Sequence, residues 1–283
     1  MMHRLNDIKD LKLMANTVRQ DLIRMLAEAG SGHTAGPLGM ADMMTALRLH
    51  FLRIDPKNPK DPDRDILILS NGHICPLQYV CMAEAGFFPK KELMTLRKLG
   101  SRLQGHPHRK SLPGLETTSG PLGCGISQAC GIALAHRYDK KKSRIFVMTS
   151  DGEHEEGNTW EGVMLAAKYD LDIIAIMDRN RIQIGGDTEK VMPLDPVKEK
   201  YKAFNWKVYE TDGHDMKKIV STLQKALKQK GPRMIIAHTV PGKDISWIEG
   251  DHTWHGKTPS KEEAEKMLEE LEKVRFKIIA DKR

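Results

Sequence analysis

Short apolar runs alternate with segments of helical periodicity over residues 145–238, and this alternation constrains the fold more than any other feature of the chain. Strands are predicted at 145–148, 173–177, 207–209 and 234–238, and helices between them at 159–169, 196–203 and 216–229. Strands that alternate with helices form βαβ units, in which the strands run parallel and the helices cover the sheet. The sequence therefore predicts an α/β fold, with a mainly parallel sheet flanked by helices on both faces.

The flanking segments extend the same architecture. Helices are predicted at 7–29, 40–52 and 125–135, a buried strand at 66–69, and an amphipathic, mixed-charge helix over the last stretch from residue 260. Gly30 is placed to end the first helix, and Asp215 to cap the helix that starts at Met216. We expect the last helix to be a solvated edge helix. Because no repeat or low-complexity linker interrupts the chain, residues 1–283 are interpreted as a single domain.

Composition excludes several classes of protein. Hydrophobic residues make up 40% and charged residues 29%, values that are ordinary for a globular domain. No apolar run reaches the roughly 18 residues of a membrane helix, and the first residues lack the apolar core of a signal peptide, so no membrane association and a cytoplasmic location are expected. The net charge of +7 is scattered and aromatic residues are only 5%, which argues against a nucleic-acid partner. The four cysteines form no C-x-x-C pair, so they are expected to be reduced, buried thiols.

Two polar residues follow neighbouring predicted strands. Asp151 comes after the strand at 145–148, and Asn180, 29 positions later, comes after the strand at 173–177. A right-handed crossover brings both strand ends to the same edge of the sheet, where ligands bind. Carboxylate and amide oxygens suit Mg²⁺, and Gly152 lets the backbone approach a phosphate closely. These residues predict a Mg²⁺–phosphate site, although turn formation and helix capping explain the same residue types.

Asp-Gly followed by a distant Asn resembles the thiamine-diphosphate motif Gly-Asp-Gly…Asn, with Ser150 in place of the first Gly. Further motifs occur in order along the chain: SGHTAGPLGM (31–40), SNGH (70–73), GHP (105–107), TTSGPLGCGIS (117–127), EGNTWEG (156–162) and WHG (254–256). Together they resemble the N-terminal, diphosphate-binding domain of transketolases over nearly the whole chain. The family's usual SGHPGAPLG differs from this chain at Thr34, Ala35 and Gly36, whereas His33 is kept.

The resemblance implies a role for each matching position. Metal ligands would be Asp151, Asn180 and the main-chain carbonyl of Ile182, with Mg²⁺ as the ion and Ca²⁺ as a possible substitute. The diphosphate and the rest of the cofactor would contact His73, Gly120, Leu122, Gly152 and Asn180. The reacting carbon and the sugar hydroxyls would face His33, His106 and His255. The acidic pair that the family places near the subunit interface would be Glu156 and Glu161.

Histidine chemistry agrees with this assignment. Transfer of a two-carbon ketol unit requires a donor hydroxyl to lose a proton and an acceptor carbonyl oxygen to gain one. Histidines with an ordinary pKa of about 6.5 serve both steps at neutral pH. His33, His73 and His106 lie in glycine-flanked loops, where functional residues concentrate. The alternative for each of them, and more so for His255, is hydrogen bonding within a turn or cap.

The resemblance also implies a partner. In this family, a Glu on a separate pyrimidine-binding domain activates the cofactor, and no second domain of this kind follows in these 283 residues. We therefore expect the N-terminal subunit of a split transketolase, active only with a C-terminal subunit that carries the pyrimidine-binding and C-terminal domains, in an α2β2 assembly. Most contacts to the phosphate and the acceptor would lie on that subunit. The substrates would be pentose and hexose phosphates, or sulfonated or branched sugars.

Two other interpretations stay open. One is a subunit of another thiamine-diphosphate enzyme, either a component that decarboxylates 2-oxo acids or a deoxyxylulose-phosphate synthase. The SGH, NGH and GHP loops argue against it, because they match the sugar-handling loops of transketolases. The other is a non-catalytic binding module that has kept the fold. The presence of Asp151, Asn180 and the loop histidines argues against that second alternative.

Overall fold

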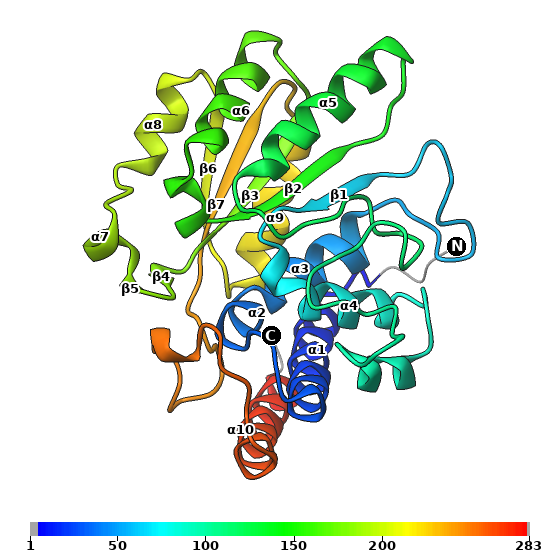
Figure 1. The fold of residues 1–283 in the computed structure, drawn as a ribbon, viewed down its shortest axis with the longest axis vertical. Helices are drawn as coiled ribbons and strands as arrows, with labels where there is room; N and C mark the ends of the chain where they lie inside the picture. The colour runs from blue at the N-terminus through cyan, green and yellow to red at the C-terminus, as the bar shows by residue number, and fades with distance from the viewer. Residues whose placement is uncertain (1–4, 282–283) are drawn as a thin grey trace.

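A five-stranded parallel sheet forms the centre of the protein (Figure 1). The computed structural model describes residues 5–281. The strands lie in the order β1-β2-β3-β7-β6 and comprise β1 (Ile66–Leu69), β2 (Ile145–Ser150), β3 (Ile173–Arg179), β7 (Arg233–His238) and β6 (Lys207–Asp212). All four neighbouring pairs are parallel. The predicted α/β fold with a parallel sheet is confirmed.

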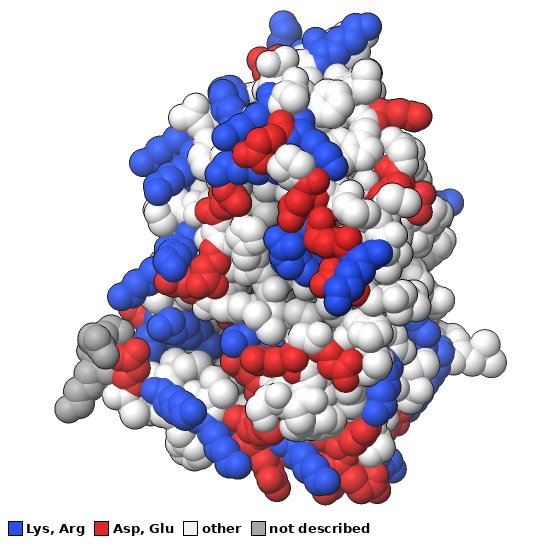
Figure 2. Space-filling model, turned by 90° about the vertical axis from the view of Figure 1, so that its left-hand side faces the viewer, with Lys and Arg blue, Asp and Glu red and all other residues white. Residues whose placement is uncertain are grey.

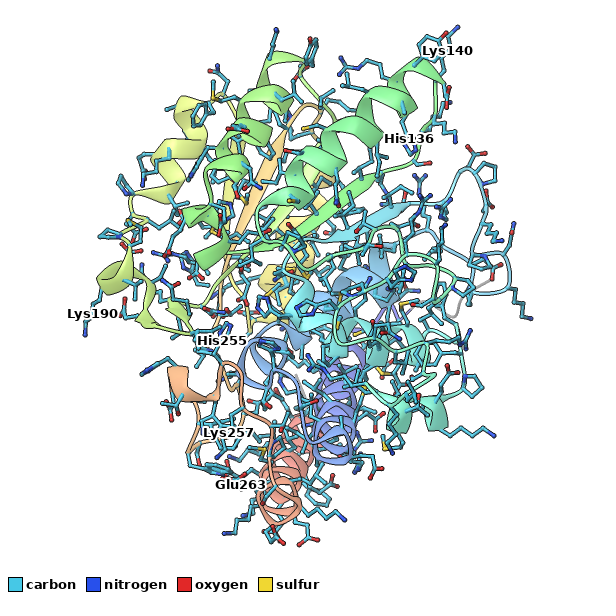
Figure 3. All side chains as sticks on the ribbon, in the orientation of Figure 1. His136, Lys140, Lys190, His255, Lys257 and Glu263 are labelled. Carbon is cyan, nitrogen blue, oxygen red and sulfur yellow. The ribbon has the colours of Figure 1, made fainter. Side chains whose placement is uncertain are left out.

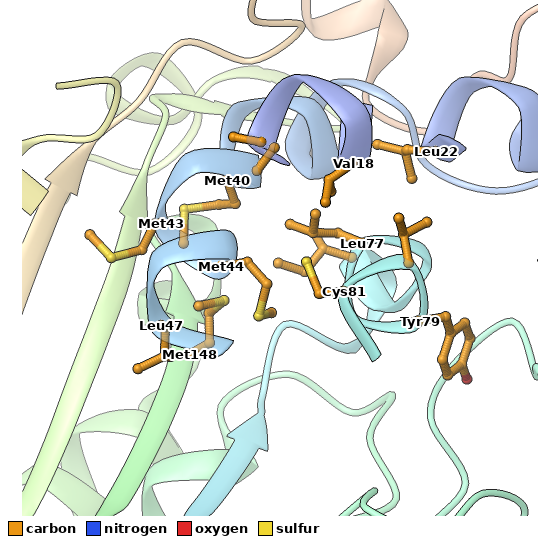
Figure 4. Packing of buried hydrophobic residues seen from close by; sticks show 14 of the residues in the cluster. Val18, Leu22, Met40, Met43, Met44, Leu47, Leu77, Tyr79, Cys81 and Met148 are labelled. Atoms are coloured by element: carbon orange, nitrogen blue, oxygen red, sulfur yellow. The ribbon is translucent and has the colours of Figure 1, made fainter. Parts of the chain in front are cut away.

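Alternate residues of the strands enter two separate hydrophobic cores, one on each face of the sheet. On one face Ile145 and Val147 of β2 pack with α5 (Cys124–Tyr138), α6 (Gly157–Lys168) and α8 (Val197–Ala203). On the other face Phe146 and Met148 pack with a larger group of helices: α1 (Ile8–Ala29), α3 (Ala41–Ala46), α4 (Cys75–Glu84), α9 (Met216–Leu227) and α10 (Lys261–Ala280). Figure 4 shows part of the second core, where methionines of α3 meet Leu77 and Cys81 of α4. Because side chains alternate along a strand, continuous apolar runs bury both faces of the sheet.

Local sequence signals explain where the helices begin and end. The Asp7 carboxylate accepts hydrogen bonds from the first turn of α1, and Gly30 ends this helix in the left-handed conformation with φ 61°. Asp215 caps α9, as predicted. A capping box between Ser260 and Glu263 starts α10. These caps satisfy backbone groups that a helix end otherwise leaves without partners.

Several details differ from the sequence-based expectation. The predicted helix at 40–52 begins as α3 and ends as a π-helical turn at Leu47–Phe51, and a separate short helix, α2 (Ala35–Gly39), precedes it. The helix α10 is more than a solvated edge, because it lies along α1 (Figure 1) and buries Ala264, Met267 and Leu271. A small hairpin of β4 (Ile182–Gln183) and β5 (Gly186–Asp187), followed by α7 (Thr188–Val191), was not anticipated.

The surface carries mixed charge. On the face seen in Figure 2, Lys and Arg side chains are interspersed with Asp and Glu. Within residues 5–281, no helix has the length and apolarity that crossing a bilayer demands.

Candidate active site

The carboxyl ends of β2 and β3 place Asp151 next to Asn180, as the sequence predicts. Ser150 and Asp178 are paired in the register of these strands, and the Asp151 N–H donates to the Asp178 carbonyl at 3.1 Å. Asp151 is fully buried, and Asn180 is 7% exposed. Both side chains therefore lie at the edge of the sheet where parallel α/β folds bind ligands.

Three N–H groups hold the Asp151 carboxylate. The Gly152 amide donates to Oδ1 at 2.8 Å, while the Arg181 amide at 2.6 Å and the Arg179 guanidinium at 3.1 Å donate to Oδ2. Burial raises the pKa of Asp151, and these donors offset the effect only in part. Asp178 is also buried, and burial together with the nearby charge of Asp151 raises its pKa to about 7.

The donor set at this edge fits a hard divalent cation. A carboxylate offers about four acceptor positions, so the three hydrogen bonds to Asp151 leave one for a metal. The Asn180 Oδ1 accepts from the Ile182 amide at 2.9 Å and keeps a second lone pair, while its Nδ2 donates to Asp178 at 2.9 Å and fixes the amide. Within residues 5–281 no group of three or more His, Cys, Asp or Glu could hold a metal. A metal at this edge would therefore depend on the amide and a main-chain carbonyl, both of which are oxygen ligands.

A cavity of about 300 Å³ opens beside these residues. Its lining comprises His33, His73, His106, Gly120, Leu122, Ser150, Gly152, Glu153, Asn180, Ile182, Gln183, Ile184 and His255. A side chain at Gly152 would reach only ordinary contact with Gln183, at 3.5 Å. Protein packing therefore leaves space beside Gly152, and a phosphate could approach its backbone closely.

Three imidazoles meet in this cavity, although they come from distant segments. His73 lies in the 3-10 turn Gly72–Ile74 after β1, His33 lies just before α2, and His255 follows the 3-10 turn His252–Trp254. Figure 3 shows His255 between the sheet and the segment that leads to α10. The ring centroids are 5.1 Å apart for His33 and His73, 5.2 Å for His73 and His255, and 5.5 Å for His33 and His255.

The histidines of the cavity are neutral at physiological pH. Burial, followed by the charges of His255 and Arg97, lowers the pKa of His33 to about 4. Burial also lowers the pKa of His73, His106 and His255. The Nδ1 atoms of His33 and His255 are buried without a hydrogen-bond partner in the described part of the chain. His33 and His255 both line the cavity, and a neutral imidazole is able to accept a proton or a hydrogen bond from a ligand.

Known proteins resemble this chain over its length. Residues 11–281 match the family described as "Transketolase, thiamine diphosphate binding domain". The chain belongs to this family. It is 39% identical over 264 residues to a protein of Actinobacillus succinogenes that is named as a subunit of apulose-4-phosphate transketolase, covering 93% of this chain and 96% of that protein. It is 38% identical over 266 residues to the 6-deoxy-6-sulfo-D-fructose transketolase subunit SqwG of a Clostridium species, covering 93% and 97%.

Single-chain transketolases match over part of their length. The human transketolase is 35% identical over 93% of this chain and 42% of its own length. The crystal structure of the transketolase from Campylobacter jejuni superposes with a TM-score of 0.87 at 31% identity, covering 97% of this chain and 46% of that one. The fold described above is therefore that of a transketolase thiamine-diphosphate-binding domain.

Two buried charged residues of this transketolase domain were missed by the sequence analysis. Glu153 accepts from Ser70 Oγ, from the Gly123 amide at 2.7 Å and from the Ser150 amide at 3.2 Å, and burial raises its pKa. Arg179 joins Asp151 to two further carboxylates, Glu189 and Asp195. Glu153 lies two positions after Asp151, and Arg179 lies directly before Asn180, so both are close to the residues of the thiamine-diphosphate motif. Their chain positions were a signal, but their burial was not visible in the sequence.

Glu156 and Glu161 are exposed and do not line the cavity. Glu156 caps the start of α6 and Glu161 lies one turn into that helix. The structure thus separates this acidic pair from the residues grouped around the histidines.

Proposed function

We propose that the chain is the N-terminal subunit of a split transketolase, which transfers a two-carbon ketol unit from a ketose phosphate to an aldose phosphate. The observation that carries the proposal is the histidine-lined cavity beside Asp151 and Asn180. The relatives support the two-subunit form, because the chain spans 96% and 97% of two proteins named as transketolase subunits, but only 42% of the human single-chain enzyme. Residues 1–283 would then act as one cofactor-binding domain.

The proposed cofactor site combines the groups at the ends of β2 and β3. Asp151, Asn180 and the Ile182 carbonyl would hold Mg²⁺, which Ca²⁺ could replace. Gly152 and His73 would contact the diphosphate, and Gly120 and Leu122 would line the rest of the cofactor. When bound, thiamine diphosphate supplies the carbon nucleophile that cleaves and forms the carbon–carbon bond.

The protein's own part in the reaction is proton transfer and orientation. His33, His106 and His255 would accept the proton of the donor hydroxyl and return a proton to the acceptor's carbonyl oxygen. Their lowered pKa values keep the rings neutral, which leaves a lone pair free to accept a proton and makes the protonated ring a strong acid that returns it. Leu122, Ile182 and Ile184 would exclude water from the same cavity.

The partner would be a C-terminal subunit with the pyrimidine-binding domain, its activating Glu and the C-terminal domain. The expected assembly is α2β2, located in the cytoplasm. Glu156 and Glu161 would lie near the subunit interface, in keeping with their exposure in the isolated chain.

Ketol transfer in a reconstituted enzyme tests the proposal. This chain alone and this chain mixed with its C-terminal partner are assayed with thiamine diphosphate, Mg²⁺, a ketose phosphate donor and an aldose phosphate acceptor. Activity only in the mixture supports the split enzyme. Activity of the chain alone would contradict the requirement for a partner Glu, and a cofactor-loaded complex that decarboxylates a 2-oxo acid would favour the other thiamine enzymes.

The names of two relatives suggest a different class of sugar substrate. One relative is named for apulose-4-phosphate and another for 6-deoxy-6-sulfo-D-fructose. A branched or sulfonated sugar is therefore the alternative to ordinary pentose and hexose phosphates. A substrate panel that contains all of these sugars, ranked by kcat/KM, distinguishes the two.

A further inference from the structure

A second, wider cavity adjoins the histidine cavity. It measures about 900 Å³ and is lined by Ser31, Arg97, Gln104, Gly105, His106, Pro107, His108, Thr118 and Ser119. His106 lines both cavities, so the two meet at this side chain. A substrate whose reacting end lies among the histidines could therefore extend its other end into the wider cavity.

The wider cavity is positively charged. Its positive charge comes from Arg97, and no Asp or Glu of residues 5–281 lines it, whereas the histidine cavity includes the buried Glu153. The charge of Arg97 contributes to the lowered pKa of both His33 and His106, after burial as the larger cause. The field of this arginine thus reaches the reacting end of the site.

Arg97 forms no ion pair with any carboxylate among residues 5–281, in contrast to its neighbours. Lys98 pairs with Glu28 and Arg102 pairs with Glu92. The Arg97 guanidinium makes two long contacts, 3.5 Å to Ser31 Oγ and 3.4 Å to the Gly105 carbonyl. These lie at the outer limit of hydrogen bonding. The exposed guanidinium therefore keeps most of its donors available to a ligand.

The backbone fixes Arg97 in this position. Its φ is 59°, in the left-handed region that arginine seldom adopts, and its amide donates to the Leu103 carbonyl at 2.9 Å. A side chain at Gly105 would come within 2.8 Å of the guanidinium. Gly105 thus leaves room for the arginine to lie against the loop that carries His106. Uncommon backbone conformations of this kind cluster at ligand sites.

We propose that Arg97 binds the terminal anionic group of the sugar substrate, a phosphate or a sulfonate. The inference rests on the proposed ketol transfer, and it adds an anion contact from this chain to those expected on the partner subunit. A planar guanidinium matches the oxygens of either group through paired N–H donors. Because no carboxylate lines the cavity, nothing there repels such an anion.

Binding to the chain without its partner gives the first test. Ribose 5-phosphate, 6-deoxy-6-sulfo-D-fructose and neutral ribose are titrated by calorimetry into the wild type, Arg97→Gln and Arg102→Gln. We expect Arg97→Gln to weaken binding of at least one anionic sugar about tenfold, with Arg102→Gln unchanged because its guanidinium is already paired with Glu92. The sugar that loses more affinity identifies the anion. Equal affinities of the wild type and Arg97→Gln for both anionic sugars would overturn the proposal.

Kinetics of the complex with the C-terminal subunit separate anion binding from support of the His106 loop. For Arg97→Gln, KM for the anionic acceptor should rise about tenfold, and the ratio of kcat/KM for this acceptor to that for neutral glycolaldehyde should fall accordingly. Arg97→Lys should restore part of the ratio, because it restores the charge. An equal loss with both acceptors would assign Arg97 to loop support alone and refute the anion site. Absence of ketol transfer in the wild-type complex would reject the proposed function, while the calorimetric result still decides the anion site.

Discussion

Two buried aspartates lie at opposite ends of the same sheet, and their surroundings differ. Asp65 precedes β1 at the amino end, Asp151 follows β2 at the carboxyl end, and neither is more than 1% exposed. Burial alone would raise the pKa of Asp65, but hydrogen bonds from Arg144 and Arg53 hold this pKa below its ordinary value. At Asp151 burial prevails and the pKa is raised.

The difference separates a structural carboxylate from one that can take a ligand. Asp65 is neutralised by two arginines, with Arg53 Nη2 at 2.8 Å from Oδ1 and Arg144 Nε at 2.8 Å from Oδ2. Asp151 shares one arginine with Glu189 and Asp195, and a further buried carboxylate, Asp178, lies beside it. Two arginines more than offset the charge of Asp65 at the amino end. At the carboxyl end Arg179 and Arg181 face three carboxylates, Asp151, Glu189 and Asp195, which leaves a negative charge that a cation would offset.

The largest expected effect is on catalysis, at the carboxyl end. Asp151→Asn should lower kcat of the reconstituted enzyme by at least about 10³-fold, because the proposed metal would lose its one charged ligand from this chain. The free energy of unfolding without ligands should fall by about 1–3 kcal/mol, because the new amide NH2 replaces an oxygen that accepts from a buried N–H, while Arg179 keeps Glu189 and Asp195 as partners. Initial rates and urea denaturation of the same preparation measure both quantities.

Thermal denaturation with ligands supplies the control for this variant. Thiamine diphosphate with Mg²⁺ should raise the Tm of wild-type protein, and removing the metal with EDTA should abolish the rise. Asp151→Asn should show no rise. A variant that kept the metal-dependent rise would place the metal elsewhere and remove the distinction between the two aspartates.

The next effect, on stability, is expected at the amino end. Asp65→Asn should lower the free energy of unfolding by about 3 kcal/mol, because two arginines lose the carboxylate that they share. The side chains of Arg53 and Arg144 are 47% and 25% exposed, so solvent relieves part of the cost. Urea denaturation measures the loss, and kcat per folded complex should stay within about twofold of the wild type. A large loss of kcat in folded Asp65→Asn would show that the amino end also serves the reaction.

The sheet could be predicted from the sequence, but the different electrostatic surroundings of Asp65 and Asp151 could not. Apolar runs and caps placed the strands and most helix ends, and the positions of Asp151 and Asn180 after β2 and β3 followed from topology. Sequence patterns did not show that Arg179 would be buried among three carboxylates, or that Arg97 would lack an ion pair. Burial and pairing depend on which segments meet in space, and the loops that meet at this site are far apart along the chain. The β4–β5 hairpin was missed because its strands have two residues each.

A smaller effect concerns the response to acid at the carboxyl end. His154 is buried just after β2, and burial lowers its pKa to about 4. Because the unfolded pKa is about 6.5, the unfolded chain binds more protons between these values, and His154 costs stability as the pH falls. Relative to His154→Gln, the wild type should lose about 2 kcal/mol of unfolding free energy between pH 7 and pH 5. Urea denaturation at several pH values gives this difference curve.

The difference curve is required because other groups titrate in the same window. The pKa of Asp178 is raised to about 7, so its contribution to the free energy of unfolding increases as the pH falls. This contribution is opposite in sign to that of His154. Asp65 adds no slope there, because its lowered pKa places its titration at more acidic pH. Parallel curves for the wild type and His154→Gln would mean that His154 has the same pKa in the folded and the unfolded chain, and acid sensitivity would then not distinguish the two ends of the sheet.

The smallest expected effect concerns the His154 ring at the carboxyl end, whose two nitrogens both have hydrogen-bond partners within the protein. His154 Nδ1 lies 2.6 Å from the Ser150 carbonyl and Nε2 lies 2.7 Å from the Tyr201 hydroxyl, so a neutral ring donates at Nδ1 and accepts from Tyr201 at Nε2. Tyr201→Phe removes this donor and should cost about 1 kcal/mol of unfolding free energy, as is usual for one hydrogen bond. The Tm rise with thiamine diphosphate and Mg²⁺ should persist, because the hydroxyl lies outside the cavity lining. Loss of the rise would connect Tyr201 to the metal site and extend the ligand-dependent region beyond Asp151, whereas an unchanged stability would show that the ring nitrogen does not need the tyrosine.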